Sequence, residues 1–231
     1  MNSKGLLIVG VIVLIAVVAL VGAIAVGNNA NTGAEVDYSQ IPQSRAEDGA
    51  FVLGDPAAPV TLVEFADFAC SHCITNEQII HQFIQEFVVT GQAKFEYRMF
   101  PTAGGDVSRF AGQIAECADT QQPGAFWEAY TLLYSLARTG QYNQDLGQRI
   151  ANELGLSYAE LLNCSINAGQ VASDVEYGRA QGVSGTPAVR VRYGDGPAEI
   201  IVVNGQSITA GGASYDQLAQ MVAQAHEQAA S

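Results

Sequence analysis

Two cysteines separated by two positions, Cys70 and Cys73, are the residues best suited to chemistry. They follow an apolar run over residues 60–68 and open a stretch with helical periodicity. At the first turn of a helix, free backbone N–H groups and the helix dipole favour negative charge, so the Cys70 thiol is expected to ionise easily. A thiolate attacks disulfides, and Cys73, one turn later, is close enough to form or resolve one. The motif therefore predicts a redox-active dithiol, with Cys70 as the nucleophile and Cys73 as the resolving cysteine.

His72 stands between these cysteines and bears on the direction of the redox reaction. If its ring is protonated or donates a hydrogen bond, it stabilises the Cys70 thiolate. A more stable reduced form makes the corresponding disulfide a stronger oxidant. The motif thus favours a donor of disulfides over a reductase.

Two other interpretations of the cysteine pair are open. It could be half of a zinc site with His72 or His81 as a third ligand, but structural zinc usually takes four ligands and the chain lacks a second C-x-x-C or H-x-H pair. It could also be an inert structural disulfide, although such closely spaced cysteines staple almost no loop. We therefore expect no metal, and no cofactor other than the redox-active disulfide itself.

The redox motif needs a strand before it and a helix after it, and the sequence indicates both. Residues 60–68 are apolar enough for a central strand, with Glu64 as the exception. Residues 94–100 predict the next strand, which Pro101 ends. Between them lies one helical stripe, formed by Ile80, Phe83, Ile84 and Phe87. The order strand, helix, strand indicates a βαβ unit.

Residues 106–182 change in character and predict an inserted all-helical subdomain, because apolar residues recur there at helical spacing in successive segments. An aromatic stripe in this region could line a hydrophobic groove, although such stripes more often belong to the core; it consists of Phe126, Trp127, Tyr130 and Tyr134. After the insertion, residues 188–192 and 199–203 predict a hairpin around a turn at 193–197. Residues 214–217 have the form of a capping box for a last amphipathic helix.

The N-terminal sequence bears on location. Residues 6–26 are almost all apolar and uncharged, long enough to span a bilayer as a helix, whereas the apolar region of a cleaved signal is usually shorter. We therefore expect residues 1–27 to be a membrane anchor, with cleavage near Ala23-Ile24-Ala25 as the alternative. Lys4 precedes the run, and the positive-inside bias would put the rest of the chain outside the cytoplasm. The polar residues 28–49 predict a linker.

The charge of the chain excludes one class of partner. The 231 residues carry a net charge of −13, with only ten Lys and Arg spread thinly along the sequence. Binding to nucleic acid requires clustered cations against the phosphates, so we expect no nucleic-acid partner.

Several motifs in combination identify a family resemblance. Val63-Glu64-Phe65 runs into Cys70-Ser71-His72-Cys73, a helical insertion follows, and Gly185-Thr186-Pro187 comes later. Over residues 50–229 the chain resembles the DsbA-type thiol:disulfide oxidoreductases of the thioredoxin superfamily. The resemblance implies an α/β thioredoxin fold interrupted by the helical insertion, and a cis peptide before Pro187. It also implies that Thr186 and Pro187 bind client chains beside the redox cysteines. An ordinary trans Pro187 that merely ends a helix is the alternative.

Two positions need separate comment within this resemblance. The family's best-known motif has proline after the first cysteine, where this chain has Ser71, and this difference bears on oxidant strength. Glu64 matches a family position for a buried acid near the resolving cysteine. Desolvation would raise the pKa of Glu64, which suits a proton relay. The alternative is that Glu64 forms a salt bridge with Lys94 or Arg98.

The two remaining cysteines, Cys117 and Cys164, both fall on apolar helical faces of the insertion. In an exported protein two leftover cysteines are more often bonded than free, so we predict a structural disulfide between them. Some members of the resembled family carry such a second bridge. The alternative is a pair of buried free thiols that act as small hydrophobes.

The leading hypothesis is a membrane-tethered, extracytoplasmic thiol:disulfide oxidoreductase that donates its Cys70–Cys73 disulfide to reduced, exported client proteins. By family resemblance, a quinone-linked membrane partner would reoxidise it. A reductase or isomerase on the same fold is one alternative, and a non-catalytic chaperone or interaction module is another. The expected division is an anchor at 1–27, a linker at 28–49, the first half of the thioredoxin fold at 50–105, the insertion at 106–182 and the second half at 183–231.

Overall fold

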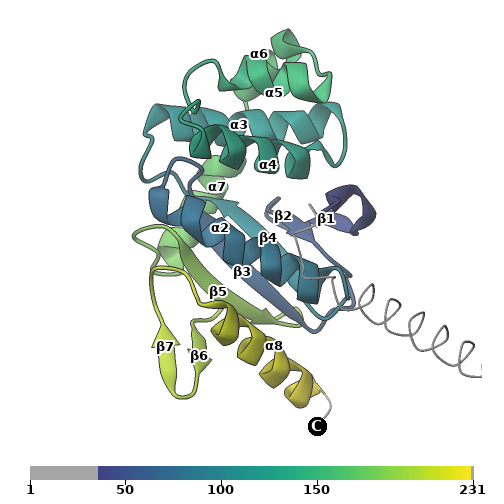
Figure 1. The fold of residues 1–231 in the computed structure, drawn as a ribbon, viewed down its shortest axis with the longest axis vertical. Helices are drawn as coiled ribbons and strands as arrows, with labels where there is room; N and C mark the ends of the chain where they lie inside the picture. Colours follow the sequence, from purple (N-terminus) through teal and green to yellow (C-terminus); the bar gives the residue numbers. More distant parts are fainter. Residues whose placement is uncertain (1–35, 230–231) are drawn as a thin grey trace, which may run out of the picture. The chain divides into compact units, whose positions relative to one another are not determined.

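The computed structural model describes residues 36–229, and these build a five-stranded sheet with helices on both faces (Figure 1). The strand order is β1-β2-β4-β3-β5. The strands are β1 (Gln43–Arg45), β2 (Phe51–Leu53), β3 (Val60–Ala66), β4 (Lys94–Met99) and β5 (Ala188–Tyr193).

β3 lies between two neighbours and carries the chain to the redox motif. It pairs in parallel with β4 and antiparallel with β5, and every one of its residues is buried. The strand ends at Ala66, two residues before the predicted end, because Asp67 begins a turn. The Asp67 side chain accepts a hydrogen bond from the Ala69 N–H, and the Asp67 carbonyl accepts one from the Cys70 N–H.

The predicted helix after the motif is α2 (Ser71–Phe83), which continues into a π-helical turn, η2 (Ile84–Val88). Ile80, Phe83 and Ile84 of the predicted stripe are fully buried. The C-terminal helix α8 (Tyr215–Ala229) packs on α2 from the same side of the sheet (Figure 1). The capping box before α8 is confirmed, because Ser214 and Gln217 exchange side chain to backbone hydrogen bonds.

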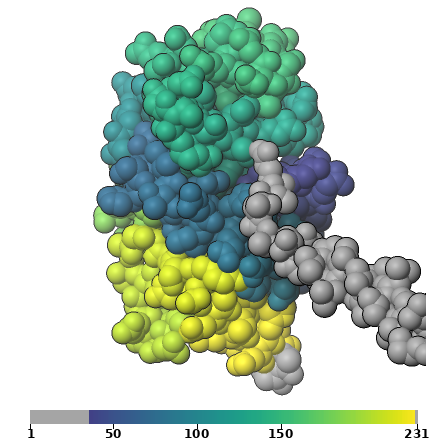
Figure 2. All heavy atoms as spheres, in the orientation of Figure 1, coloured from purple at the N-terminus to yellow at the C-terminus, as the bar shows by residue number. Residues whose placement is uncertain are grey.

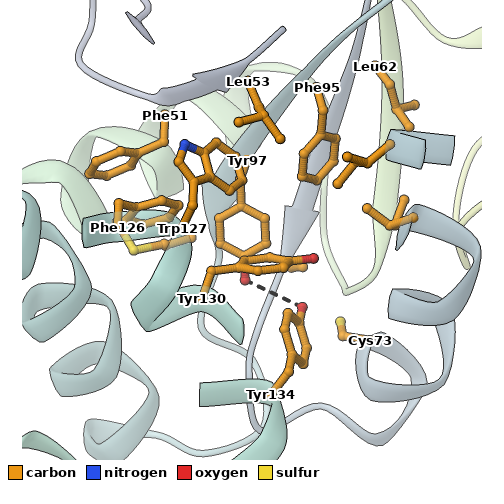
Figure 3. Close-up of a cluster of buried hydrophobic side chains, with 14 of the residues drawn as sticks. Phe51, Leu53, Leu62, Cys73, Phe95, Tyr97, Phe126, Trp127, Tyr130 and Tyr134 are labelled. Atoms are coloured by element: carbon orange, nitrogen blue, oxygen red, sulfur yellow. Dashed lines mark hydrogen bonds between the residues drawn. The ribbon is translucent and has the colours of Figure 1, made fainter. Parts of the chain in front are cut away.

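The insertion folds as five helices. The first four lie at the opposite end of the described residues from α8 (Figure 2), and the fifth packs against β4. The aromatic stripe of the insertion belongs to the core, which is where such stripes are more often found. The four side chains are at most 1% exposed: Phe126, Trp127, Tyr130 and Tyr134 (Figure 3). The helices are α3 (Asp106–Gln121), α4 (Ala125–Arg138), α5 (Leu146–Leu154), α6 (Tyr158–Ser165) and α7 (Gln170–Ala180).

The two faces of the sheet differ. Leu62 and Ala66 of β3 join the large core beneath α2 and the insertion. Val63 and Phe65 point to the other face and join a small apolar cluster against α7. This alternation follows from the period of two along a strand, and it decides which charged residues can meet.

The prediction of a linker is wrong for residues 36–49, because these residues are folded onto the domain. Tyr38 is buried and stacks on Trp127 with ring centroids 5.9 Å apart. A short 3-10 helix, η1 (Tyr38–Gln40), and strand β1 follow, and the sequence prediction missed β1 and β2. Strands of three residues are too short to show a period.

The predicted anchor, and the first part of the linker up to residue 35, lie outside the described residues. No helix among the described residues is long and apolar enough to cross a membrane.

The predicted hairpin of residues 188–192 and 199–203 is only partly correct. β5 forms, but it meets the second segment at a single bridge between Val191 and Glu199. β6 (Ile201–Val203) pairs instead with β7 (Gln206–Ile208) in a separate two-stranded sheet. Asn204 and Gly205 both have positive φ, at 52° and 73°, which matches the tight Asn-Gly turn of a two-residue hairpin. That dipeptide was the signal in the sequence for the true hairpin.

Candidate redox-active site

Cys70 and Cys73 lie at the start of α2, at the end of β3 where the sheet and the insertion meet. Cys70 is the N-cap residue of the helix, with φ −75° and ψ 121°, and Cys73 is in its first turn. Both are free thiols, with Cys70 7% exposed and Cys73 1% exposed. The helix start therefore presents Cys70 toward the surface and keeps Cys73 behind it.

The two thiols have opposite acid–base properties. Burial alone would raise the pKa of Cys70, but hydrogen bonds from the Cys73 N–H and the Thr186 side chain outweigh it and bring that pKa below its ordinary value. Burial raises the pKa of Cys73 far above its ordinary value, and the nearby Glu64 carboxyl adds to this. Cys70 is thus the thiol that ionises more readily, and Cys73 is the one that holds its proton more firmly.

The loop expected to bind clients lies directly against Cys70. The Thr186–Pro187 peptide is cis, as the resemblance implies. The Cys70 thiol donates a hydrogen bond to the Thr186 carbonyl oxygen, with Sγ and O 3.4 Å apart. Behind this loop, the Gly211 N–H donates to the Pro187 carbonyl at 3.1 Å. The structure therefore brings together Cys70, Cys73, Thr186 and Pro187, which are far apart in the sequence.

Glu64 is buried in the middle of β3, and burial raises its pKa to about 8. Its Oε1 accepts a hydrogen bond from the Asn76 side-chain amide at 2.8 Å, while Oε2 has no hydrogen-bond partner among the described residues. A carboxyl with this pKa exchanges protons near neutral pH and lies close enough to Cys73 to influence its ionisation.

The alternative salt bridge of Glu64 with Lys94 or Arg98 is wrong. Arg98 lies on the other face of the sheet, opposite Phe65 in the strand register. There it pairs with carboxylates that include Glu96, at 2.6 Å. The Lys94 ammonium, at the other end of β4, donates to the Pro56 carbonyl at 3.3 Å. The alternation of side chains along β4 therefore separates both cations from Glu64.

His72 reaches solvent rather than the Cys70 sulfur. Its side chain is exposed and makes no hydrogen bond or ion pair within residues 36–229. Its backbone N–H is among the donors that lower the pKa of Cys70, after those of Cys73 and Thr186. Stabilisation of the thiolate by the ring stays a prediction. Within the same described residues, no three His, Cys, Asp or Glu side chains are arranged to hold a metal ion.

An aromatic cluster borders the buried side of the site. Phe68 packs against the rings of Tyr97, Tyr130 and Tyr134, and Cys73 lies at the edge of this group (Figure 3). The hydroxyl oxygens of Tyr97 and Tyr134 are 3.5 Å apart, and burial raises the pKa of both phenols well above the usual range. The cluster excludes water from the inner side of Cys73, which supports the raised pKa of that thiol.

The second cysteine pair forms a disulfide within the insertion. Cys117 in α3 and Cys164 in α6 are bonded, with Cα atoms 5.8 Å apart. The bond joins two helices that pack against each other. Neither cysteine contacts the redox pair in any hydrogen bond described above, and a structural role for the bond stays a prediction.

Three residues of the site were missed from the sequence: Asp67, Asn76 and Thr102. Asn76 lies one helical turn beyond Cys73, and that spacing was the available signal for a polar residue on the buried side of α2. Asp67 stands just before the motif, where an acidic residue after a strand indicates a turn. Thr102 lies in the loop after β4 and had no signal, because its contacts arise only in the folded chain.

A thioredoxin-type sheet, a C-x-x-C pair at the start of the helix after β3, and a cis-proline loop against the first cysteine define a thioredoxin-fold dithiol protein. Comparison with known sequences agrees, since a family model described as thioredoxin matches residues 46–193. The chain belongs to this thioredoxin family.

Two curated relatives show how similar the chain is to known proteins in sequence. The chain is 34% identical over 155 residues to Na(+)/H(+) antiporter NhaA 3 of Salinispora tropica, covering 64% of this chain and 23% of that protein. It is 27% identical over 150 residues to disulfide bond formation protein D of Bacillus subtilis, covering 61% of this chain and 66% of that protein. The chain thus spans about a quarter or less of the length of the first curated relatives it matches.

Among solved structures, Wolbachia pipientis alpha-DsbA1 superposes with a TM-score of 0.66 at 17% identity, over 80% of this chain and 95% of that one. Oxidised BdbD from Bacillus subtilis superposes with a TM-score of 0.61 at 24% identity, over 76% and 92%. These likenesses show the fold: a thioredoxin fold with a helical insertion.

Proposed function

We propose that this protein is a thiol:disulfide oxidoreductase that donates its Cys70–Cys73 disulfide to client proteins. A client thiolate attacks the Cys70 sulfur, the Cys70–Cys73 bond breaks, and a mixed disulfide forms while Cys73 leaves. A second client thiolate then attacks the client sulfur of the mixed disulfide, and Cys70 leaves as a thiolate. Two electrons pass from the client sulfurs to the protein, and the client gains one disulfide.

The observation that carries this proposal is the asymmetry of the two thiols. Cys70, with its lowered pKa, is a better leaving group in the second step than Cys73 would be, and it is the more stable thiolate of the two. A stabilised reduced form makes the disulfide more oxidising, so the reaction favours oxidation of the client. The Thr186–Pro187 loop supplies main-chain groups beside Cys70 on which an extended client chain can pair.

Glu64 serves as the proton relay for Cys73 in this proposal. At neutral pH a carboxyl with a pKa of about 8 is mostly protonated, so it can give a proton to the Cys73 sulfur as that sulfur leaves. The high pKa of Cys73 makes the sulfur a strong acceptor for that proton. Asn76 keeps the carboxyl in place through its 2.8 Å hydrogen bond.

The proposed location is outside the cytoplasm, on a membrane anchor formed by the uncharged residues 6–26, with a quinone-linked membrane protein as reoxidant. A disulfide within the insertion supports an oxidising compartment, because structural disulfides persist mainly outside the cytosol. The relative named disulfide bond formation protein D supports the activity.

The test is a redox titration of the purified protein against glutathione, followed by oxidation of a reduced, unfolded client. We expect a potential well above that of cytoplasmic thioredoxin, which is about −270 mV. We also expect client oxidation to be lost in Cys70→Ala. A potential near −270 mV would favour the reductase or isomerase alternative. A cellular role that survives Cys70→Ala would favour a non-catalytic interaction module.

A further inference from the structure

One buried carboxylate joins three segments that surround Cys70. Asp67 is 3% exposed, and its two oxygens accept four hydrogen bonds. Oδ1 accepts from the Ala69 N–H at 2.9 Å and from the Ser108 hydroxyl at 2.6 Å. Oδ2 accepts from the N–H groups of Thr102 and Ala103, both at 2.7 Å. The carboxylate therefore fixes the redox turn, the loop after β4 and the start of α3 to one another.

The loop fixed by Asp67 reaches the cis-proline loop through the Thr102 side chain. The hydroxyl oxygens of Thr102 and Thr186 are 2.5 Å apart. Thr186 in turn contacts Cys70, whose Sγ lies 3.4 Å from the Thr186 carbonyl oxygen. A continuous series of short contacts thus runs from Asp67 through Thr102 and Thr186 to the sulfur of Cys70.

The direction of the contact between Thr102 and Thr186 matters for the sulfur. Each hydroxyl has one proton to donate. If Thr102 donates to the Thr186 oxygen, the Thr186 proton is left for the Cys70 sulfur. A thiolate accepts a charge-assisted hydrogen bond, which is stronger than a neutral one, so ionisation of Cys70 favours this direction. The Thr186 side chain is one of the groups that lower the pKa of Cys70, and it acts in the same direction on Cys73.

We propose that Thr102 and Asp67 are positioning residues for the Cys70 thiolate. Thr102 orients the Thr186 hydroxyl toward the sulfur, and Asp67 holds Thr102 where it can do so. Neither residue touches the reacting sulfur in any contact described above, and both act through Thr186. The inference rests on the proposed function, because it concerns the nucleophile of that reaction.

Thr102→Val tests the first part, because it removes the hydroxyl at constant size on an exposed residue. The readout is the ultraviolet absorbance of the thiolate as a function of pH, in protein with a reduced redox pair and an intact Cys117–Cys164 disulfide. Subtracting the titration of Cys70→Ser isolates the signal of Cys70. Without Thr102 to orient it, the Thr186 hydroxyl is expected to turn away from the sulfur. Loss of its hydrogen bond to the thiolate predicts an about two- to tenfold lower ratio of thiolate to thiol below the midpoint.

Matched variants separate this effect from a general disturbance. Thr102→Ser keeps the hydroxyl and is expected to retain the wild-type titration. Thr120→Val removes an exposed hydroxyl whose hydrogen bond among the described residues is within α3, to the Glu116 carbonyl, and is expected to leave the titration unchanged.

Asp67→Asn tests the second part selectively. An amide keeps Oδ1, which serves Ala69 and Ser108, but replaces Oδ2 by an NH₂ group that cannot accept from Thr102 and Ala103. We expect a fall in the thiolate ratio of the same direction as in Thr102→Val. Asp55→Asn is the control, since exposed Asp55 makes the same Oδ1 contact two residues ahead, to the Ala57 N–H.

The double variant of Asp67→Asn and Thr102→Val decides whether the two residues act in series. If Asp67 acts through Thr102, the double variant has about the thiolate ratio of the more affected single variant. An unchanged ratio in Thr102→Val, or fully multiplicative effects in the double variant, would overturn the inference. Because the titration needs no client, a protein that behaves as expected here and oxidises no client would contradict the proposed function alone.

Discussion

Glu64→Gln provides the sharpest test of the buried acid, because it predicts how stability changes with pH. The folded protein has a Glu64 pKa of about 8, against an ordinary value of 4.5. Below pH 4.5 the group is protonated in both the folded and the unfolded chain, and its titration contributes nothing. Between 4.5 and 8 the unfolded chain releases a proton that the folded chain keeps, so the free energy of unfolding falls as pH rises.

The magnitude follows from the width of that pH range. A proton held only by the folded state changes the free energy of unfolding by about 1.4 kcal/mol for each pH unit. Across the range from 4.5 to 8 the wild type therefore loses about 5 kcal/mol that the glutamine variant does not lose. Above about pH 8 both states are ionised, and the difference between the two proteins becomes constant.

Glu64→Gln also has an effect that does not depend on pH. The amide oxygen can still accept from Asn76, but the new NH₂ group takes the place of Oε2, which has no partner among the described residues. A buried, unpaired polar group costs about 1 to 3 kcal/mol, as a constant offset. The slope, rather than the offset, is therefore the quantity to compare.

The assay is urea denaturation at a series of pH values from 4 to 9, in a Cys70→Ser background that keeps the Cys73 thiol free beside Glu64. Asp174, whose pKa burial raises to about 7, titrates in the same range and is present in both proteins, so its contribution cancels in the difference. Exposed Glu128→Gln is the control and should run parallel to the background protein. Parallel curves for Glu64→Gln as well would refute a raised pKa at Glu64.

Two further predictions concern stability. Replacing Cys117 and Cys164 by serine opens a loop with a sequence separation of 47, so the free energy of unfolding in urea is expected to fall by about 4 kcal/mol. The pH midpoint of the Cys70 thiolate titration is expected to stay unchanged. An unchanged stability would mean that the unfolded chain gains little conformational entropy from losing the bond. Gly212→Ala puts a Cβ 2.6 Å from the Asn76 side-chain oxygen at a φ of +79°, whereas the Cβ of Gly105→Ala, at φ +56°, meets nothing within 4 Å. Gly212→Ala is therefore expected to lower the midpoint of thermal unfolding more than Gly105→Ala does. Equal losses of stability would show that Asn76 moves aside freely.

The sequence was most informative where chemistry and local structure coincide. Cys70 and Cys73 were identifiable because their spacing, the apolar strand before them and the helical stripe after them all indicate the same arrangement. The insertion was identifiable because its helices are long enough to show a period. The short strands β1 and β2 were not, since three residues carry no period and their pairing is decided by neighbours distant in sequence.

The polar contacts of the site could not be predicted from the sequence, for a different reason. Whether Glu64 meets Arg98 or Asn76 depends on which face of the sheet each side chain occupies, and that requires the register of β3 against β4. The contact between Thr102 and Thr186 joins two loops 84 positions apart, and no local pattern indicates it. Residue types could identify the reacting sulfur, but not the groups that orient its surroundings.

The bond between Cys117 and Cys164 can form only if the newly made chain meets an oxidant. Cys117 is 0% exposed in the finished fold whereas Cys164 is only partly buried, so an outside oxidant can reach the pair only at the Cys164 sulfur. The oxidant must therefore act on Cys164 in the folded chain, with Cys117 then displacing it from inside, or act before α3 and α6 have packed together. A protein proposed to supply disulfides is thus first a recipient, and its supply in the cell depends on an oxidant that is already at work, either another enzyme or an earlier copy of itself.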